Sequence, residues 1–134
     1  MRNLLIFTTA VLLTVFFSCA SDAYTGLVID ARGFGLMPGM SPRVFDTAGN
    51  QIYGTTQAAP DYVEEEGMAR YAETVDEART SETAGSEPLV VKAIGRSSDP
   101  CNTAVTLSAE DGQQILQANY EDYFLNNYKV VIVL

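Results

Sequence analysis

The sequence has 134 residues, of which 47% are hydrophobic, so we expect a single domain with one modest core. Eight Lys and Arg residues against seventeen Asp and Glu residues give a formal charge of -9. Without the N-terminal segment described next, which contains Arg2, seven bases remain against seventeen acids, a net charge of -10. Such a surface repels phosphate backbones and anionic lipid head groups, and we therefore expect no nucleic-acid partner.

The first residues have the three-part layout of an export signal. Met1–Asn3 is a short basic start, residues 4–17 (LLIFTTAVLLTVFF) form an apolar run, and small residues follow. The run is too short for a comfortable membrane span, which takes about 20 apolar residues. We interpret 1–18 as an export signal and 19–23 as a short tether before a single domain over 24–134. An uncleaved anchor or a core helix is the alternative.

Two cysteines bear on how the signal ends. The segment Phe16–Cys19 resembles a bacterial lipobox, although its outer positions are bulkier than usual, and we favour lipidation of Cys19. Ordinary cleavage after Ala20 or after Ala23 is the alternative. Cys101 has no histidine anywhere in the chain to activate it, so we interpret it as a small buried or half-buried side chain.

The first half of the expected domain consists of three strands around a glycine-rich bend. Residues 25–30 alternate in the manner of a strand, whereas 31–40 hold three glycines and a proline and are too interrupted for a helix. Residues 43–46 and 51–53 predict a β-hairpin. Asp46 suits the start of its turn, and a glycine follows at 49 where a positive φ is needed.

The second half predicts two amphipathic helices and three strands. Apolar residues at three- and four-residue steps predict one helix from its cap Asp61 to about Arg79, and another from its cap Ser108 to Asn126–Asn127. The expected buried face of the second helix consists of Ile115, Leu116, Asn119, Tyr123 and Phe124. Strands are expected at 88–94, 103–107 and 128–134.

The order of these elements predicts an α+β fold. The apolar run at 128–134 is typical of a central strand that is covered on both faces. We expect a single small domain in which two amphipathic helices pack on one mixed β-sheet.

Several kinds of site lack the residues that they need. Gly33 and Gly35 begin a dinucleotide-binding pattern, but Pro38 stands where its third glycine belongs and a strand follows in place of a helix. Without histidine there is neither a zinc ligand set nor a catalytic triad, and no phosphate-binding loop or calcium loop occurs. We predict no cofactor, no metal and no catalytic residue.

Asp30 is the carboxylate hardest to exclude from catalysis, because it ends a predicted strand. Arg32 lies two residues further along and shares its face. We interpret the two as a structural ion pair, with a carboxylate-based hydrolase that uses Asp30 as the enzymatic alternative.

Four large apolar residues lie in the glycine-rich bend and are candidate protein-contact residues: Phe34, Leu36, Met37 and Met40. They either fold back onto the core or form a patch for a partner. We favour the first, since exposed apolar loops are rare on soluble monomers.

The segments TGLVIDARGFGL and SPRVFD, followed by EPLVVKAIG and the helix that leads into YKVVIVL, resemble bacterial envelope lipoproteins of the FlgP, FlgT and Lpp-twenty type. The resemblance covers nearly all of residues 24–134. It implies a small α+β domain behind an export signal and a non-catalytic role in the envelope, tied in some members to the flagellar motor. The weak lipobox and the lack of an extra domain depart from that pattern.

We therefore expect a non-enzymatic exported envelope protein with a structural or assembly role, located in the periplasm or anchored to a membrane by lipid on Cys19. Its expected partners are envelope proteins or further copies of itself. The alternative is a periplasmic module that holds a small ligand between the bend and the helix at 61–79.

Overall fold

The computed structural model describes residues 23–39, 42–54, 67–97 and 103–134. Four sequence-based predictions therefore lie outside the described residues. They concern the export signal with Cys19, the contact residue Met40, the helix cap Asp61, and Cys101.

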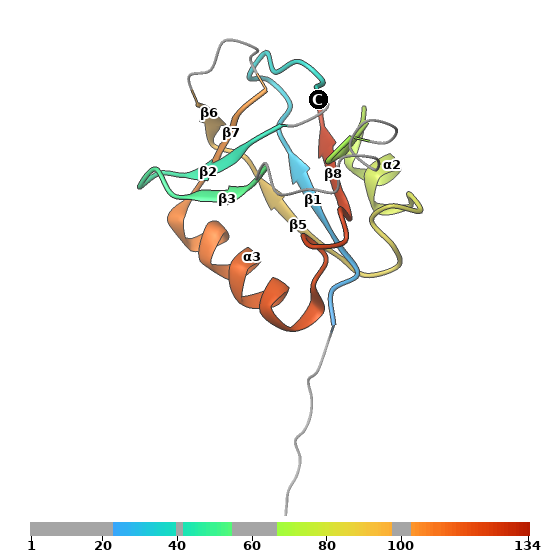
Figure 1. The fold of residues 1–134 in the computed structure, drawn as a ribbon. Helices are drawn as coiled ribbons and strands as arrows, with labels where there is room; N and C mark the ends of the chain where they lie inside the picture. The colour runs from blue at the N-terminus through green and yellow to red at the C-terminus, as the bar shows by residue number, and fades with distance from the viewer. Residues whose placement is uncertain (1–22, 40–41, 55–66, 98–102) are drawn as a thin grey trace, which may run out of the picture.

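Four parallel strands form the first sheet: β1 (Gly26–Asp30), β4 (Arg70–Ala72), β5 (Pro88–Lys92) and β8 (Val130–Val133). Their order is β4-β8-β1-β5, so β8 has a neighbour on each side (Figure 1). All four residues of β8 are buried. This confirms that the apolar run at the end of the sequence is a central strand.

The second sheet has the order β3-β2-β7-β6 and contains the predicted hairpin of β2 (Val44–Asp46) and β3 (Gln51–Tyr53). The other two strands are β6 (Gly95–Arg96) and β7 (Val105–Leu107). In the turn, the Asp46 carboxylate accepts hydrogen bonds from the backbone N–H groups of Ala48 and Asn50, both at 2.9 Å. Gly49 has a φ of 87°, as the turn prediction required.

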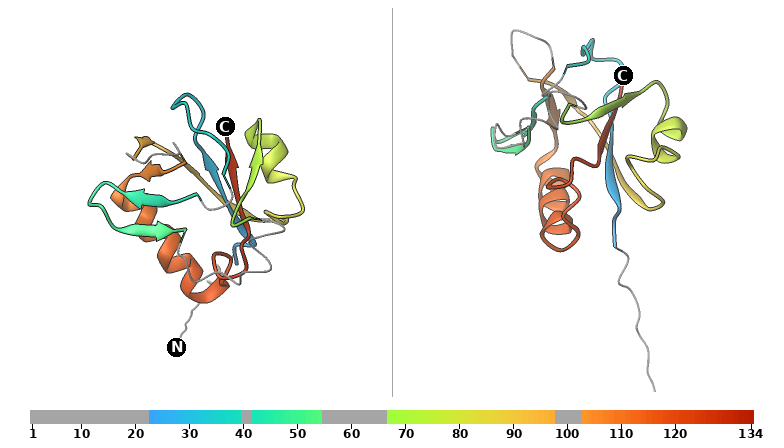
Figure 2. Two further views of the ribbon diagram at one scale, coloured as in Figure 1. Left: turned by 45° about the horizontal axis from the view of Figure 1, so that its top comes forward. Right: turned by 45° about the vertical axis from the view of Figure 1, so that its right-hand side comes forward.

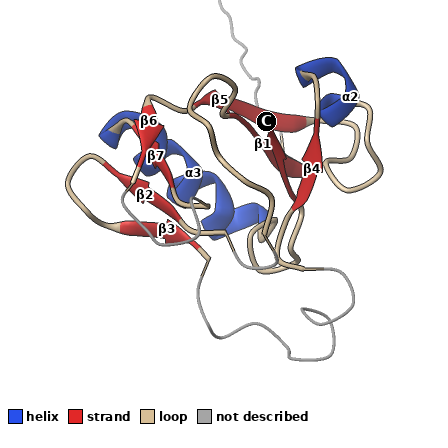
Figure 3. Ribbon diagram, turned by 90° about the horizontal axis from the view of Figure 1, so that it is seen from above, coloured by secondary structure: helices blue, strands red, loops and turns tan. Residues whose placement is uncertain are grey.

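A single extended segment joins the two sheets. The backbone N–H of Ala93 donates to Asp30 at the end of β1 (2.8 Å), whereas the next N–H, of Ile94, donates to Thr106 in β7 (2.9 Å). Successive N–H groups of an extended chain point to opposite sides, so β1 and β7 flank the segment that carries β5 and β6. The prediction of one sheet was wrong in this respect: the described residues form two four-stranded sheets, joined at residues 93–94 (Figure 3).

The first predicted helix is much shorter than expected. α2 spans Val75–Arg79, and its N-cap Thr74 accepts a hydrogen bond from the Glu77 N–H at 3.0 Å. Residues 70–72, placed in the helix by their spacing, form β4 beside β8 instead. Gly67 has a φ of 76°, which no residue of a right-handed helix adopts, so a continuous helix over 61–79 is wrong.

The second helix begins as predicted and ends early. α3 spans Ala109–Asp122, and the Ser108 hydroxyl accepts the Asp111 N–H at 3.1 Å. The helix stops at Tyr123, whose φ of 56° is left-handed, and not at Asn126–Asn127. Ile115 and Phe124 are buried as expected, but Leu116 and Tyr123 are 44% and 58% exposed, so part of the predicted buried face was wrong.

The core lies on both faces of the first sheet. One face carries Leu27, Ile29 and Ile132, which pack with residues of the second sheet and with Ile115 and Phe124. The other face carries Val28, Val131 and Val133, which pack with small residues of β4 and of the α2 region. Figure 2 shows α2 and α3 on opposite sides of this sheet. The two sheets and two helices form the small α+β domain that the sequence predicts.

None of the helices in the described ranges has the length and the apolar content that crossing a membrane requires.

Candidate functional site

The glycine-rich bend occupies the end of the domain opposite to the point where the chain enters it. The backbone N–H of Tyr24 donates to the Asp122 carboxylate at 2.8 Å, which ties the entering chain to the last turn of α3. β1 then runs the length of the first sheet, so residues 31–39 follow at the opposite end of its strands (Figure 1). The bend is therefore presented away from the N-terminal side of the domain.

The described contact candidates of the bend differ in burial. Leu36 is 9% exposed and belongs to the core, and Phe34 is partly buried against that core. Met37 is 56% exposed. The preferred interpretation, a bend folded back on the core, thus holds for Phe34 and Leu36, whereas Met37 is available to a partner.

Tyr71 of β4 fastens the bend to the first sheet. Its hydroxyl donates to the Gly39 carbonyl oxygen at 2.8 Å and accepts the Gly39 N–H at 2.9 Å. Burial raises the pKa of the Tyr71 hydroxyl above its usual value, against a smaller opposing effect of the hydrogen bond with Gly39. The hydroxyl therefore stays protonated at neutral pH and keeps both bonds.

Asp30 forms the predicted ion pair with Arg32. Nε and Nη2 of Arg32 donate to the two carboxylate oxygens at 2.9 Å each, and Nζ of Lys92 lies 3.9 Å from Oδ2. Asp30 is only 8% exposed, yet the hydrogen bonds from the Arg32 side chain hold the pKa of the carboxyl below its usual value. An ionised carboxylate engaged through both oxygens is suited to fixing the end of β1 and is not a proton donor at neutral pH.

A row of exposed side chains continues from this ion pair along β5 and β6. Val90, Lys92, Ile94 and Arg96 are all exposed, whereas the preceding Leu89 and the intervening Val91 and Ala93 are buried. We call the four exposed residues the basic ridge. Sequence reasoning assigned Val90, Lys92 and Ile94 to the strand expected at 88–94 and left Arg96 outside it. It did not single out the ridge, although the alternation of these residues with apolar ones was its signal.

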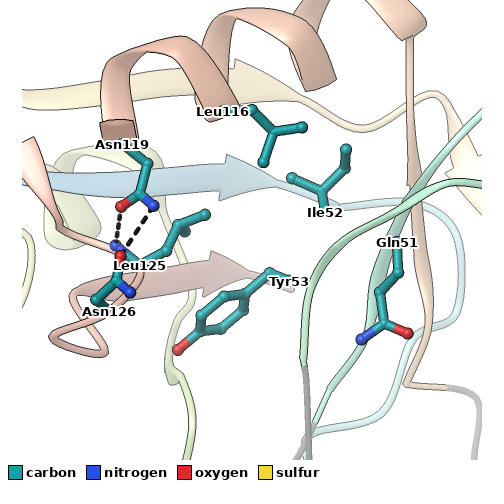
Figure 4. Close-up of a pocket in the computed structure, with 7 residues that line it drawn as sticks. All are labelled: Gln51, Ile52, Tyr53, Leu116, Asn119, Leu125 and Asn126. Carbon is teal, nitrogen blue, oxygen red and sulfur yellow. Dashed lines mark hydrogen bonds between the residues drawn. The ribbon is translucent and has the colours of Figure 1, made fainter. Parts of the chain in front are cut away.

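A groove lies between β3 and α3 and was also missed (Figure 4). It measures about 500 Å³ and is lined by Gln51, Ile52, Tyr53, Leu116, Asn119, Leu125 and Asn126. The Asn119 amide is committed to the turn after α3, since it accepts the Leu125 N–H at 2.8 Å and donates to the Asn126 side chain at 3.0 Å. The groove therefore combines an apolar floor with a fixed amide rim and has no charged side chain among its lining residues.

Within the part of the chain that the structure describes, no three acidic or cysteine side chains gather in a way that could hold a metal ion.

A search of curated proteins found no match to this chain. A family model described as the second domain of Treponema pallidum Tp0624 matches residues 26–134. The match begins at the first residue of β1, runs through both sheets and both helices, and ends at the last residue of the sequence. The chain therefore belongs to the family of the second domain of Treponema pallidum Tp0624.

Proposed function

We propose that this protein is a non-enzymatic exported component of the bacterial envelope with a structural or assembly role, carried on a membrane by lipid at Cys19. In this proposal the folded domain presents the glycine-rich bend to a protein partner or to another copy of itself. The flagellar assembly implied by the resemblance to the FlgP, FlgT and Lpp-twenty type is the first system in which to look for that partner.

The observation that carries the proposal is the polarity of the first sheet. The chain enters the domain at Tyr24, beside the end of α3. Tyr24 follows Cys19 by five residues, and five residues of chain reach at most about 18 Å. A lipid on Cys19 would keep that end of the domain close to the membrane. The bend, with Met37 56% exposed, would then face away from the membrane, where a partner can reach it.

The intact mass of the mature protein tests export and anchoring. The proposal predicts a chain that starts at Cys19 and carries the added mass of its acyl groups. A mature chain that starts at Ser21 or Tyr24 would remove the lipid anchor from the proposal, and an unprocessed chain would remove export as well.

Substitution in the bend tests the contact. Met37→Ser should reduce self-association, or recovery of a co-purifying envelope protein, because it removes the exposed apolar side chain from the contact. Leu116→Ser is the matched control, since Leu116 is an exposed apolar residue on α3, at 44%. Equal losses in both variants, or none in either, would contradict a contact through the bend.

The alternative, a periplasmic ligand-binding module, was expected to hold its ligand between the bend and a helix at 61–79, but residues 70–72 form β4 and a continuous helix over that range is wrong. We propose the groove between β3 and α3 as the site for this alternative, because its volume of about 500 Å³ is in the range of small-molecule sites. A ligand that binds there should raise the melting temperature by mass action, and Leu116→Ser should remove the effect. A screen without any stabilising compound would count against this alternative.

A further inference from the structure

We propose that the basic ridge is the docking surface for an acidic protein segment that lies extended along β5 and β6. The inference rests on the proposed function in one respect, that the partner met at this end of the domain is a protein. It adds the chemical class of that partner.

The ridge is an uncovered strip that begins on β5 of the first sheet and continues through Ile94 to Arg96 of β6 in the second sheet. Val90 of β5 is in register with Val28 of β1, and Val28 belongs to the cluster on the α2 side of the sheet. α2 packs on β1, β4 and β8. On β5, Val90 is 38% exposed and the Lys92 side chain is 76% exposed, and Ile94 beyond it is 53% exposed. Apolar and basic side chains therefore alternate along an open face.

The local charge is opposite in sign to that of the whole protein. Asp30 pairs with Arg32 and has Lys92 at 3.9 Å, and Arg96 lies further along the ridge, so these four described residues carry three positive charges and one negative charge in a chain with a formal charge of -9. Arg96 reaches the bend, because its Nη1 lies 3.7 Å from the position that a Cβ on Gly35 would take. Charge complementarity therefore calls for an acidic partner.

The spacing favours a protein segment over the other anionic partners. Residues of an extended chain that share a face recur about every 6.8 Å, and the two basic residues of the ridge alternate with two apolar ones at this period. A partner strand in which carboxylates and apolar residues alternate along one face matches both features. Nucleic acids, anionic bilayers and a second copy of this chain bring a large negative charge against the rest of this acidic molecule, whereas a short extended segment contacts the ridge alone.

Binding of a labelled peptide to the purified, processed protein tests the proposal. The probe is a peptide of about ten residues in which Glu and Val alternate at every second position with Ser between them, so that one face of the extended peptide carries both. Binding is followed by fluorescence anisotropy, and the counterpart peptide has Lys in place of Glu. We expect the Glu peptide to bind at least about tenfold more tightly than the Lys peptide, with an affinity that falls as salt rises.

Two paired variants locate the binding. Lys92→Gln combined with Arg96→Gln should weaken binding of the Glu peptide about tenfold, and Ile94→Ser about threefold. The control, Arg79→Gln combined with Lys129→Gln, removes the same charge from exposed positions elsewhere and should change affinity less than about twofold. Arg32 is left in place because it pairs with Asp30. Thermal melts of each variant confirm that it is folded.

The proposal is overturned if the Lys peptide binds equally well or if the control pair weakens binding as much as the ridge pair. It is also overturned if the ridge pair abolishes binding to phosphatidylglycerol vesicles, or self-association, while leaving peptide binding intact. The intact mass of the same sample reports separately on export and lipidation, so failure of the proposed function is distinguishable from failure of the ridge.

Discussion

Tyr71→Phe should loosen the bend without disturbing the sheet that carries it. The substitution removes one hydroxyl and with it both hydrogen bonds to Gly39, at 2.8 and 2.9 Å. Each such bond contributes about 0.5–1.5 kcal/mol net, and Gly39 is partly exposed, so water can replace some of what is lost. We expect a decrease in the free energy of unfolding of about 1–2 kcal/mol and in the melting temperature of about 4–8 °C.

Urea titration measures the global effect, and hydrogen exchange of the Gly39 amide measures the local one. A loss of about 1–2 kcal/mol corresponds to roughly a fivefold to thirtyfold faster exchange. Tyr120→Phe is the matched control, because Tyr120 is 81% exposed, and it should change stability by less than about 0.5 kcal/mol. Unchanged stability and unchanged Gly39 exchange in Tyr71→Phe would refute the reasoning. The packing of Leu36 and Phe34 on the core would then be what holds the bend in position.

Three further substitutions test other parts of the structure. Tyr123→Gly should raise the free energy of unfolding in urea by about 0.5–1 kcal/mol, since glycine adopts the φ of 56° without the strain of a side chain. Gly26→Ala should lower it by about 1–3 kcal/mol, because the new Cβ would lie 2.5 Å from the backbone oxygen of Ala84; a wild-type melting temperature would contradict that contact. The pKa of Asp30 is lowered from 3.8 on folding, so its contribution to stability is present above that value and is lost as pH falls through the folded pKa. Asp30→Asn should therefore reduce the loss of stability between about pH 5 and pH 2, and an unchanged dependence of the melting temperature on pH would contradict the assignment.

Predictions that depended on a few neighbouring residues were confirmed. The hairpin turn is held by the Asp46 carboxylate and Gly49, and α3 begins at its cap Ser108, because each of these contacts spans only a few positions. The same holds for the Asp30–Arg32 pair, which the two-residue period of a strand brings together.

Predictions that depended on distant partners failed where those partners decide the outcome. The spacing of apolar residues around Tyr71 fits a helix, but residues 70–72 pair with β8 and form the strand β4. Periodicity in one segment contains no information about a strand whose register partners lie 61 residues further along the chain. The early end of α3 has a different and local cause: Asn119 accepts the Leu125 N–H and fixes the turn that begins at Tyr123, an alternative to a helix that continues to Asn126–Asn127.

The candidate site was predicted in part. The sequence marked Phe34, Leu36 and Met37 as apolar residues in a loop, but which of them is exposed depends on how residues 31–39 pack, and only Met37 is. For the basic ridge, the alternation in the sequence indicates which side chains share a face, but no local pattern shows that α2 packs on β1, β4 and β8 and leaves this face of β5 exposed.

The bend and the ridge together form one continuous surface, because β1 and β5 are parallel. Parallel neighbours end at the same edge of a sheet, so Asp30 and Lys92 are register partners and the segments that follow them, the bend and β6, leave side by side. The Asp30 carboxylate connects the bend with the ridge. Both of its oxygens accept hydrogen bonds from Arg32, and Nζ of Lys92 lies 3.9 Å from Oδ2. A partner that neutralised Lys92 and Arg96 would therefore reach the bend at Gly35, since Nη1 of Arg96 lies 3.7 Å from the position that a Cβ on Gly35 would take. Loss of binding in the ridge variants and in Met37→Ser should coincide if one partner occupies both.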